Sequence, residues 1–297
     1  MQNCFHRTLG LIVFLLAATP MAVATASDDT NKPLDQYIRL TRDADDRPLA
    51  LETAVVSFQA ADGQDDQLRI DLIGAIHIAD QSYFAELNRL FRKYDVVLYE
   101  LVAPEGDNVP VPGRNPGGVI GGMQVGMKSV LDLAFQLDEI DYTAENFIHA
   151  DLSPQEFAQA MRDRNESFAG MFFRIMGRSM SEQAKEPFGA GDIRLLAAMF
   201  APDRAHRMKL IMAEQFAEME DQLDIFDGPD GSTIVTDRNT KALEVLRRKM
   251  AAGHKRIAIF YGAGHLADFQ RRLQEEFGMK HTATDWVSAW SLVDPND

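Results

Sequence analysis

The chain has 297 residues, of which 46% are hydrophobic and 25% are charged, and its formal net charge is −15. This composition is ordinary for a globular protein and excludes wholesale disorder. The negative charge disfavours electrostatic binding to nucleic acid or anionic lipid, so we expect neither as a partner.

Residues 1–26 are predicted to be a signal peptide rather than part of the fold. An apolar run begins at Leu9 and ends before Pro20, and Ala24 and Ala26 fit the small-residue positions before a cleavage site at Ser27. The alternative is an N-terminal membrane anchor, but a spanning helix needs roughly 20 apolar residues. We therefore expect an exported protein, periplasmic or secreted, with no stable transmembrane anchor after cleavage.

The single cysteine, Cys4, lies inside this predicted signal peptide. The mature chain would then have neither a thiol nor a disulfide. Any metal site must consequently be built from His, Asp and Glu side chains.

The first half of the mature chain alternates between strand-like and helical patterns. Residues 27–48 are polar and are interpreted as a lead-in. Strands are predicted over 51–59 and 68–76, with an Asp-Gly turn between them. Apolar residues recur at helical spacing over 81–93, and 95–101 is a third strand-like run. The order strand, loop, helix, strand is typical of a parallel βαβ unit.

The middle of the chain is predicted to be a long loop followed by helices. Residues 104–126 are rich in glycine and proline and are interpreted as a substrate-side lid; a phosphate cradle is the less favoured alternative, because no Gly-Lys-Ser/Thr ending follows the glycines. Residues 128–230 are mostly helical in pattern and are interpreted as a helical insertion. Within them, Ser153 and Pro154 form a typical helix start.

The last part of the chain repeats the strand–loop–helix pattern. The expected elements are a helix over 236–252, a strand over 256–261, a helix over 266–277 and a strand over 284–292. Residues 27–297 are therefore predicted to form a single α/β domain. Its expected architecture is a mainly parallel central sheet flanked by helices, with the helical insertion between its two halves.

A short Gly-Ala-x-His-x-Ala-Asp motif occurs twice, ending at Asp80 and at Asp268. In each copy a strand precedes the motif and an amphipathic helix follows it. The glycine lets the backbone bend and avoids a Cβ near the site, and His77 and His265 then project from carboxyl ends of strands. Two histidines in matching positions favour a shared functional site over core histidines. We interpret the two aspartates as helix caps.

Glu100 and Arg238 are further candidates. Glu100 closes an apolar run, and a buried carboxylate there needs a cation, a metal or hydrogen-bond donors. Arg238 begins a predicted helix and could supply that cation or clamp a substrate carbonyl or carboxylate. A surface salt bridge is an equally good interpretation of Arg238.

The paired G-x-x-H motifs ending at His77 and His265, the strand-end Glu100 and the pair Arg238-Asn239 resemble the TraB/PrgY/GumN family, which includes the animal TIKI proteins. The arrangement is more distantly similar to the erythromycin esterase and ChaN-like group. The resemblance covers about residues 50–290 and implies an α/β fold with a helical insertion. It also implies that His77 and His265 are metal ligands or bases and that Glu100 is a third metal ligand or a general base. Arg238 and Asn239 match the family's Arg-Asn element and are implied to be catalytic together with Glu100. TIKI proteins are described as metal-dependent proteases, so a peptide substrate is implied.

The sequence leaves three functions open. The first is a metal-dependent peptidase or related hydrolase of the cell envelope, acting on a peptide or small molecule with Zn, Mn or Co. The second is a metal-independent, esterase-like hydrolase in which a histidine paired with Glu100 activates water. The third is a non-catalytic protein that binds a peptide, a metal or haem. Serine hydrolases, zincins and Walker-type nucleotide hydrolases are disfavoured because their motifs do not occur.

Overall fold

The computed structural model describes residues 37–61, 67–104, 133–167, 170, 194, 197–198, 200–220 and 231–294. The predicted signal peptide lies outside these ranges. So do most of the predicted loop over 104–126 and a large part of the predicted helical insertion.

The fold is built on a seven-stranded mixed sheet with the strand order β1-β2-β3-β8-β5-β7, in which β9 also pairs with β2. Strand β2 is antiparallel to β1, β3 and β9, whereas β3, β8, β5 and β7 pair in parallel. Every strand of this sheet except β2 therefore runs in the same direction. The strands are β1 (Ile38–Arg42), β2 (Pro48–Ala60), β3 (Arg69–Ala75), β5 (Val96–Tyr99), β7 (Phe147–His149), β8 (Arg256–Gly262) and β9 (Met279–Ser291).

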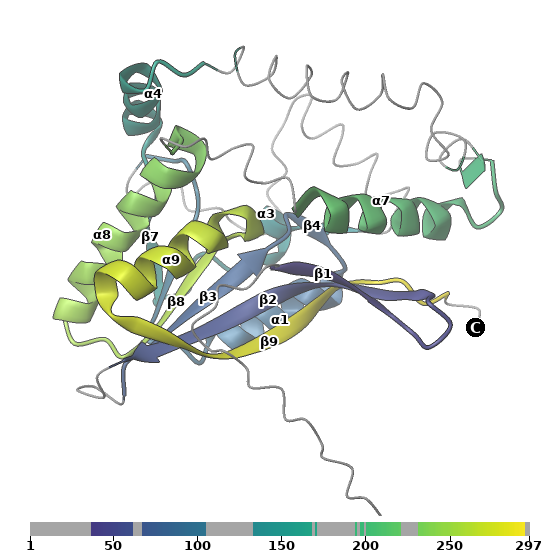
Figure 1. Ribbon diagram of the computed structural model, residues 1–297, viewed down its shortest axis with the longest axis horizontal. Coiled ribbons are helices and arrows are strands. Elements are labelled where there is room, and N and C mark those ends of the chain that lie inside the picture. The colour runs from purple at the N-terminus through teal and green to yellow at the C-terminus, as the bar shows by residue number, and fades with distance from the viewer. Residues whose placement is uncertain are drawn as a thin grey trace, which may run out of the picture.

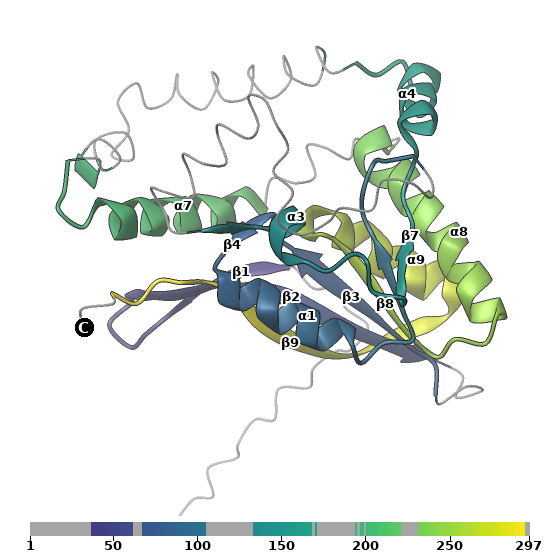
Figure 2. The same ribbon diagram turned by 180° about the vertical axis from the view of Figure 1, so that it is seen from behind.

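Helices cover both faces of this sheet. Helix α1 (Gln81–Phe91) lies on one face, and α8 (Arg238–Ala251) and α9 (Leu266–Phe277) lie on the other (Figure 1, Figure 2). Strands β4 (Ile78–Ala79) and β6 (Ala134–Phe135) form a separate small antiparallel sheet.

The remaining helices of the described residues lie at the carboxyl end of the parallel strands (Figure 1). They are α3 (Gln136–Glu139), α4 (Pro154–Asp163) and α7 (Arg204–Glu220), with a π-helical turn at Thr233–Asp237 and a 3₁₀ turn at Ala263–His265. Among the described helices, none is both long enough and apolar enough to cross a membrane.

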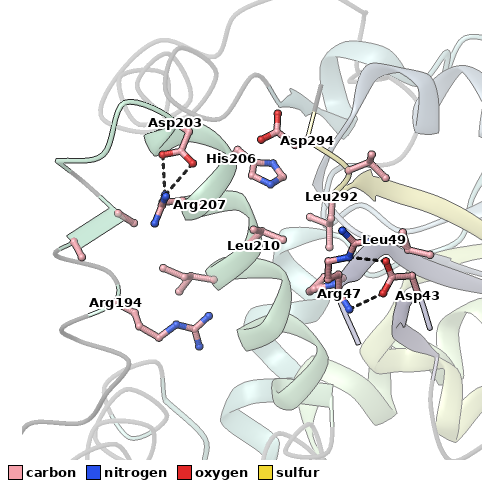
Figure 3. Close-up of a pocket in the computed structure, with 15 residues that line it drawn as sticks. Asp43, Arg47, Leu49, Arg194, Asp203, His206, Arg207, Leu210, Leu292 and Asp294 are labelled. Carbon is pink, nitrogen blue, oxygen red and sulfur yellow. Dashed lines mark hydrogen bonds and ion pairs between the residues drawn. The ribbon is translucent and has the colours of Figure 1, made fainter. Parts of the chain in front are cut away.

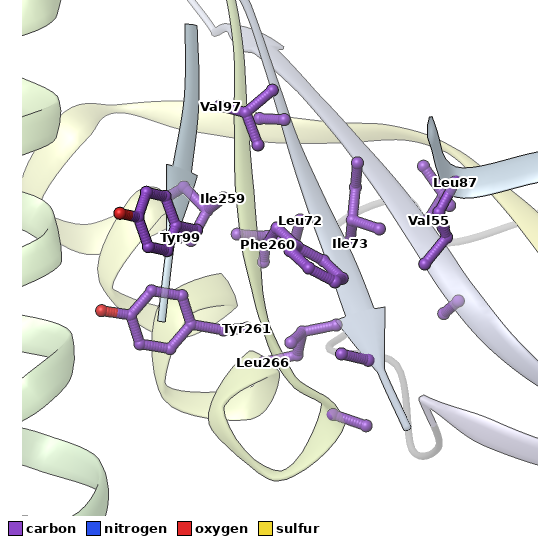
Figure 4. Packing of buried hydrophobic residues seen from close by; sticks show 14 of the residues in the cluster. Val55, Leu72, Ile73, Leu87, Val97, Tyr99, Ile259, Phe260, Tyr261 and Leu266 are labelled. Atoms are coloured by element: carbon purple, nitrogen blue, oxygen red, sulfur yellow. The ribbon is translucent and has the colours of Figure 1, made fainter. Parts of the chain in front are cut away.

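The central parallel strands β3, β5 and β8 are buried on both faces, as their mostly apolar sequences predict. Leu72, Val97 and Ile259, from β3, β5 and β8, are fully buried members of one hydrophobic cluster (Figure 4). Interiors packed in this way hold their side chains in fixed positions. The core therefore fixes the three strand ends that carry the candidate residues.

The structure confirms most of the predicted elements and corrects three details. The expected lead-in contains β1, an edge strand whose side chains are mostly only partly buried, so its sequence looks polar. The range expected to be helical contains β6 and β7, which are too short to show a strand period. Strand β8 also lies between β3 and β5, so the two strands of the predicted βαβ unit are parallel without being neighbours.

Candidate functional site

Three neighbouring strands bring the main candidates to one place. His77 follows β3, Glu100 follows β5 and His265 follows β8, which lies between the other two. A Cβ atom added to Gly262 would lie 3.3 Å from Oε2 of Glu100, 3.8 Å from Cδ2 of His265 and 4.0 Å from Nε2 of His77. The three side chains predicted from the sequence therefore gather around one glycine, whose missing side chain leaves room for them.

Glu100 is a buried and ionised carboxylate. Its Oε2 accepts the backbone N–H of Gly262 at 2.6 Å, and its Oε1 lies 2.7 Å from Nη2 of Arg238. Burial by itself would raise the pKa of Glu100, but His265, Arg238, the Gly262 N–H and His77 together lower this pKa to about 2. A carboxylate with so low a pKa is a good cation ligand and a poor general base at neutral pH.

Arg238 forms a buried ion pair with two carboxylates. It begins α8, and besides contacting Glu100 it donates from Nε and Nη2 to Asp151 at 3.0 and 2.6 Å. Burial opposes the charge on Arg238, but Asp151 and Glu100 outweigh it and raise the pKa of Arg238. The alternative of a surface salt bridge is therefore wrong, since only 11% of this side chain is exposed. The guanidinium of Arg238 and the carboxylates of Glu100 and Asp151 together carry a formal net charge of about −1.

His265 is buried, and Asn239 holds its ring at Nδ1. Its Nδ1 lies 2.7 Å from Oδ1 of Asn239, and its Nε2 lies 3.7 Å from Oε1 of Glu100. Burial lowers the pKa of His265 and so favours the neutral imidazole. Asn239 is fully buried and contacts the site only through His265, so we regard it as a positioning residue.

His77 is exposed and is held in a similar way by Gln136, the first residue of α3. The Nδ1 of His77 lies 2.9 Å from Oε1 of Gln136, whose Nε2 donates to the hydroxyl of Tyr142 at 2.7 Å. The backbone N–H of Gln136 also donates to the carbonyl of His77. In both histidines, a side-chain amide therefore engages Nδ1 and leaves Nε2 for another partner.

A cavity of about 230 Å³ opens beside these groups. Its polar lining comes from His77, Glu100, Gln136 and Arg238, and its apolar lining from Leu101, Val102, Phe135 and Leu137. Leu137 is 40% exposed, which is unusual for a large apolar side chain in this protein. The site thus combines charged and imidazole groups with an apolar wall.

A larger cavity of about 750 Å³ lies between α7, the β1–β2 connection and the end of β9 (Figure 3). Its charged side chains pair with one another, as Arg47 does with Asp43 and Arg207 with Asp203 (Figure 3). Apolar side chains such as Leu210 and Leu292 complete the lining. None of the candidate residues contributes to it, so we place the functional site at the smaller cavity.

The candidate metal ligands suit a divalent cation by their chemistry. A metal requires a deprotonated carboxylate and imidazole lone pairs, and its histidine ligands usually donate their second ring N–H to a neighbouring group. Glu100 is ionised, and Nε2 is the unengaged nitrogen of both His77 and His265. In the part of the chain that the structure describes, however, no group of three or more His, Cys, Asp or Glu side chains is placed to hold a metal ion. Closing around an ion would require these side chains to approach one another.

The two motif aspartates lie at helix starts as predicted, Asp80 at the N-cap of α1 and Asp268 in the first turn of α9, but the predicted side-chain caps are wrong, since the Asp80 side chain makes no capping hydrogen bond and the N-cap of α9 is His265. Asp80 pairs with Nζ of Lys209 at 2.6 Å and accepts the backbone N–H of Ser291. Asp268 lies in the first turn of α9 and accepts from Nδ2 of Asn239 at 2.9 Å. Only the second aspartate is connected to the site.

Sequence reasoning missed Gln136, Asp151 and the contact that Asp268 makes. Asp151 follows β7 much as Glu100 follows β5, and recognising the short run Phe147–His149 as a strand would have pointed to it. Gln136 has no such signal in the sequence. No protein-family model, no curated protein and no solved structure matches the chain, so these side chains and their geometry carry the functional argument.

Proposed function

We propose that this protein is a hydrolase acting on peptides in the cell envelope, and that His77, His265 and Glu100 hold the divalent metal ion that it uses. The observation supporting this proposal is the pair of Nε2 atoms beside one ionised carboxylate, each imidazole held at Nδ1 by an amide. The resemblance to the TraB/PrgY/GumN family implies the same ligands. The envelope location rests on the predicted signal peptide.

Each residue would have a distinct part in hydrolysis. A bound metal ion would polarise the scissile carbonyl and lower the pKa of an attacking water to about 7. Glu100 stays ionised because Arg238 and the Gly262 N–H stabilise its charge. Arg238, which lines the cavity, orients Glu100 through their ion pair.

The cavity favours an uncharged, apolar segment of substrate. Four of the described lining residues are apolar, and Arg238 is already paired with two carboxylates. A substrate carboxylate would therefore meet a site with net negative charge rather than a free guanidinium. This disfavours the carboxylate clamp considered from the sequence and suits an apolar residue next to a peptide bond.

A second candidate function is hydrolysis without metal. Two observations favour it. Both oxygens of Glu100 already have hydrogen-bond or ion-pair donors, and the described residues include no preformed metal site. In this version, the neutral His265 would take a proton from water at Nε2, with Glu100 stabilising the resulting imidazolium. A third candidate is a binding protein that holds a peptide, a metal or haem without turnover.

Metal content and peptide hydrolysis of the purified protein would decide between these functions. We expect one divalent ion per chain in the wild type, and its loss in His77→Ala and His265→Ala. His206→Ala is the matched control, because His206 lines the other cavity. Peptides with apolar residues should be cleaved by the wild type and the control only.

The other outcomes separate the alternatives. Hydrolysis that persists in a chelator but disappears in His265→Ala would favour the metal-free mechanism. Tight binding of peptide, metal or haem with no product under Zn²⁺, Mn²⁺ or Co²⁺ would favour the binding protein. Full activity in both histidine variants would exclude this site for either kind of hydrolysis.

A further inference from the structure

Three buried polar side chains form a row of hydrogen bonds that ends at His265. Oδ2 of Asp268 accepts from Nδ2 of Asn239 at 2.9 Å, and Oδ1 of Asn239 lies 2.7 Å from Nδ1 of His265. The exposed fractions of these residues are 7%, 0% and 6%, respectively. Buried polar groups that lose a partner cost free energy, so the direction of each hydrogen bond is strongly constrained.

The carboxylate fixes the direction of this row of hydrogen bonds. An ionised carboxylate only accepts hydrogen bonds, so Asn239 turns its NH₂ group toward Asp268 and toward the backbone carbonyl of His265, 3.1 Å away. Its amide oxygen then faces Nδ1 of His265 and also only accepts. The hydrogen of the neutral imidazole must therefore be on Nδ1, and Nε2 keeps its lone pair on the side of Glu100.

We propose that Asp268 is a positioning residue that acts through Asn239 to hold His265 in the Nδ1–H tautomer, with the Nε2 lone pair facing the site. Arg271 contacts the other oxygen of Asp268, Oδ1, at 2.5 Å, and so takes no part in the hydrogen bonds that lead to His265. The charge on Asp268 makes its bond to Asn239 stronger than a bond between neutral groups.

No carboxylate–amide pair of this kind fixes His77, although His77 occupies the same position in the other copy of the motif. The amide of Gln136 that holds it is itself bonded to the hydroxyl of Tyr142, which can donate as well as accept. That amide can be reversed without losing a hydrogen bond, so the tautomer of His77 is not fixed in the same way. The matching aspartate, Asp80, instead pairs with Lys209 and does not contact either histidine's amide partner.

Asp80 and Arg271 provide matched control positions for a test. The protein would be labelled with ¹⁵N in its histidine rings, and ring ¹⁵N–¹H spectra would be recorded near neutral pH with a chelator present. We expect wild-type His265 to show widely separated Nδ1 and Nε2 shifts, as a single Nδ1–H tautomer does. In Asp268→Ala this separation should shrink as the other tautomer becomes populated, while the His77 signals stay in place and show that the fold is intact.

The two controls should leave the His265 spectrum unchanged. Asp80→Ala removes the matching aspartate, and Arg271→Ala removes the ion pair but keeps the carboxylate acceptor. The inference is overturned if wild-type His265 is the Nε2–H tautomer, or if Asp268→Ala leaves its two shifts as far apart as in the wild type.

The idea that this tautomer serves metal binding rests on the proposed function, and titration with Zn²⁺ tests it separately. Removing the direct hydrogen-bond partner of a metal-binding histidine weakens metal affinity about 10- to 100-fold. Asp268 acts one step further out, through Asn239, so Asp268→Ala should bind Zn²⁺ about 10-fold more weakly than Asp80→Ala, the lower end of that range. Absence of Zn²⁺ binding in the wild type would contradict the metal-dependent function. The ring spectra would still decide whether Asp268 sets the tautomer.

Discussion

At the scale of single residues, the ionisation of Glu100 links the site to the stability of the fold. The folded protein lowers the pKa of this carboxyl from 4.5 to about 2. A carboxyl with a lowered pKa contributes stability above its unfolded pKa, and this contribution is lost as the pH falls through the folded pKa. Glu100 therefore stabilises the fold near neutrality and ceases to do so in acid.

We predict that the free energy of unfolding depends less on pH in Glu100→Gln than in the wild type. Between pH 4.5 and about 2, the wild type should lose stability that the variant, which has no group to protonate at this position, does not lose. The difference should be about 3 kcal/mol over this range. Urea unfolding of the metal-free proteins at several pH values measures it, and parallel curves for the two proteins would contradict the assignment.

The site could be predicted from the sequence as far as its residues follow recognisable strands. His77, Glu100 and His265 come within three residues after the apolar strands β3, β5 and β8, and parallel strands place their carboxyl ends at one edge. Asp151 follows a strand of three residues, too short for its pattern to be recognised. The hydrogen-bond partner of Asp268 could not be predicted, because side-chain direction within a helical turn is decided by packing.

At the scale of elements, the turn before α8 determines where Arg238 lies. Gly231 precedes this π-helical turn with φ +75°, a backbone conformation that L side chains rarely adopt. A Cβ atom there would also lie 2.5 Å from Oγ1 of Thr236, inside the turn. A side chain at this position would therefore push directly on the segment that leads into Arg238.

We predict that Gly231→Ala is more destabilising than Gly278→Ala. Both glycines have positive φ, but a Cβ at Gly278 would meet nothing within 4 Å. Gly278→Ala should cost about 1 kcal/mol from backbone strain alone. Gly231→Ala should cost at least about 1 kcal/mol more because of the steric clash.

Thermal or denaturant unfolding of the two glycine variants gives this comparison. Hydrolysis or metal binding should also be impaired in Gly231→Ala alone, since Thr236 lies two residues before Arg238. Equal destabilisation of the two variants would show that the turn relaxes around the added methyl group.

At this scale the sequence predicted the long elements and missed the short or partly exposed ones. Helix α9 was predicted with its observed bounds because its apolar face is regular and Gly278 ends it in the left-handed conformation. Strand β1 lies within the predicted polar lead-in, since an edge strand does not need an apolar sequence.

At the scale of the whole molecule, strand β9 holds the loop that carries His77 in place. Trp290 of β9 is fully buried, donates from Nε1 to the carbonyl of Ile78 at 2.8 Å, and packs edge-on against Phe216 of α7. The backbone N–H of Asp80 also donates to Ala289. The position of His77 therefore depends on residues at the opposite end of the chain.

We predict that Trp290→Ala destabilises the protein by about 3–5 kcal/mol, the usual cost of removing a large buried aromatic side chain. Trp286→Ala is the matched control, because Trp286 lies in the same strand but is only partly buried, packing against the edge of the core and stacking under the guanidinium of Arg39, 4.0 Å away. That change should cost clearly less than the loss of Trp290, since less apolar surface is removed from the interior. Chemical denaturation measures both values, and similar losses in the two variants would contradict the role given to β9.

The pairing of β9 with β2 also has a consequence for how the protein is made. Partners such as Leu51 and Trp290 come from nearly opposite ends of the chain. A ribosome releases the first partner long before it releases the second, so one edge of β2 must wait unpaired until residues 279–291 have been made. Contacts so distant in sequence slow folding, and an exposed strand edge invites aggregation in the meantime. The sheet therefore stays unfinished until β9 has been synthesised, and the nascent protein depends on chaperones until then.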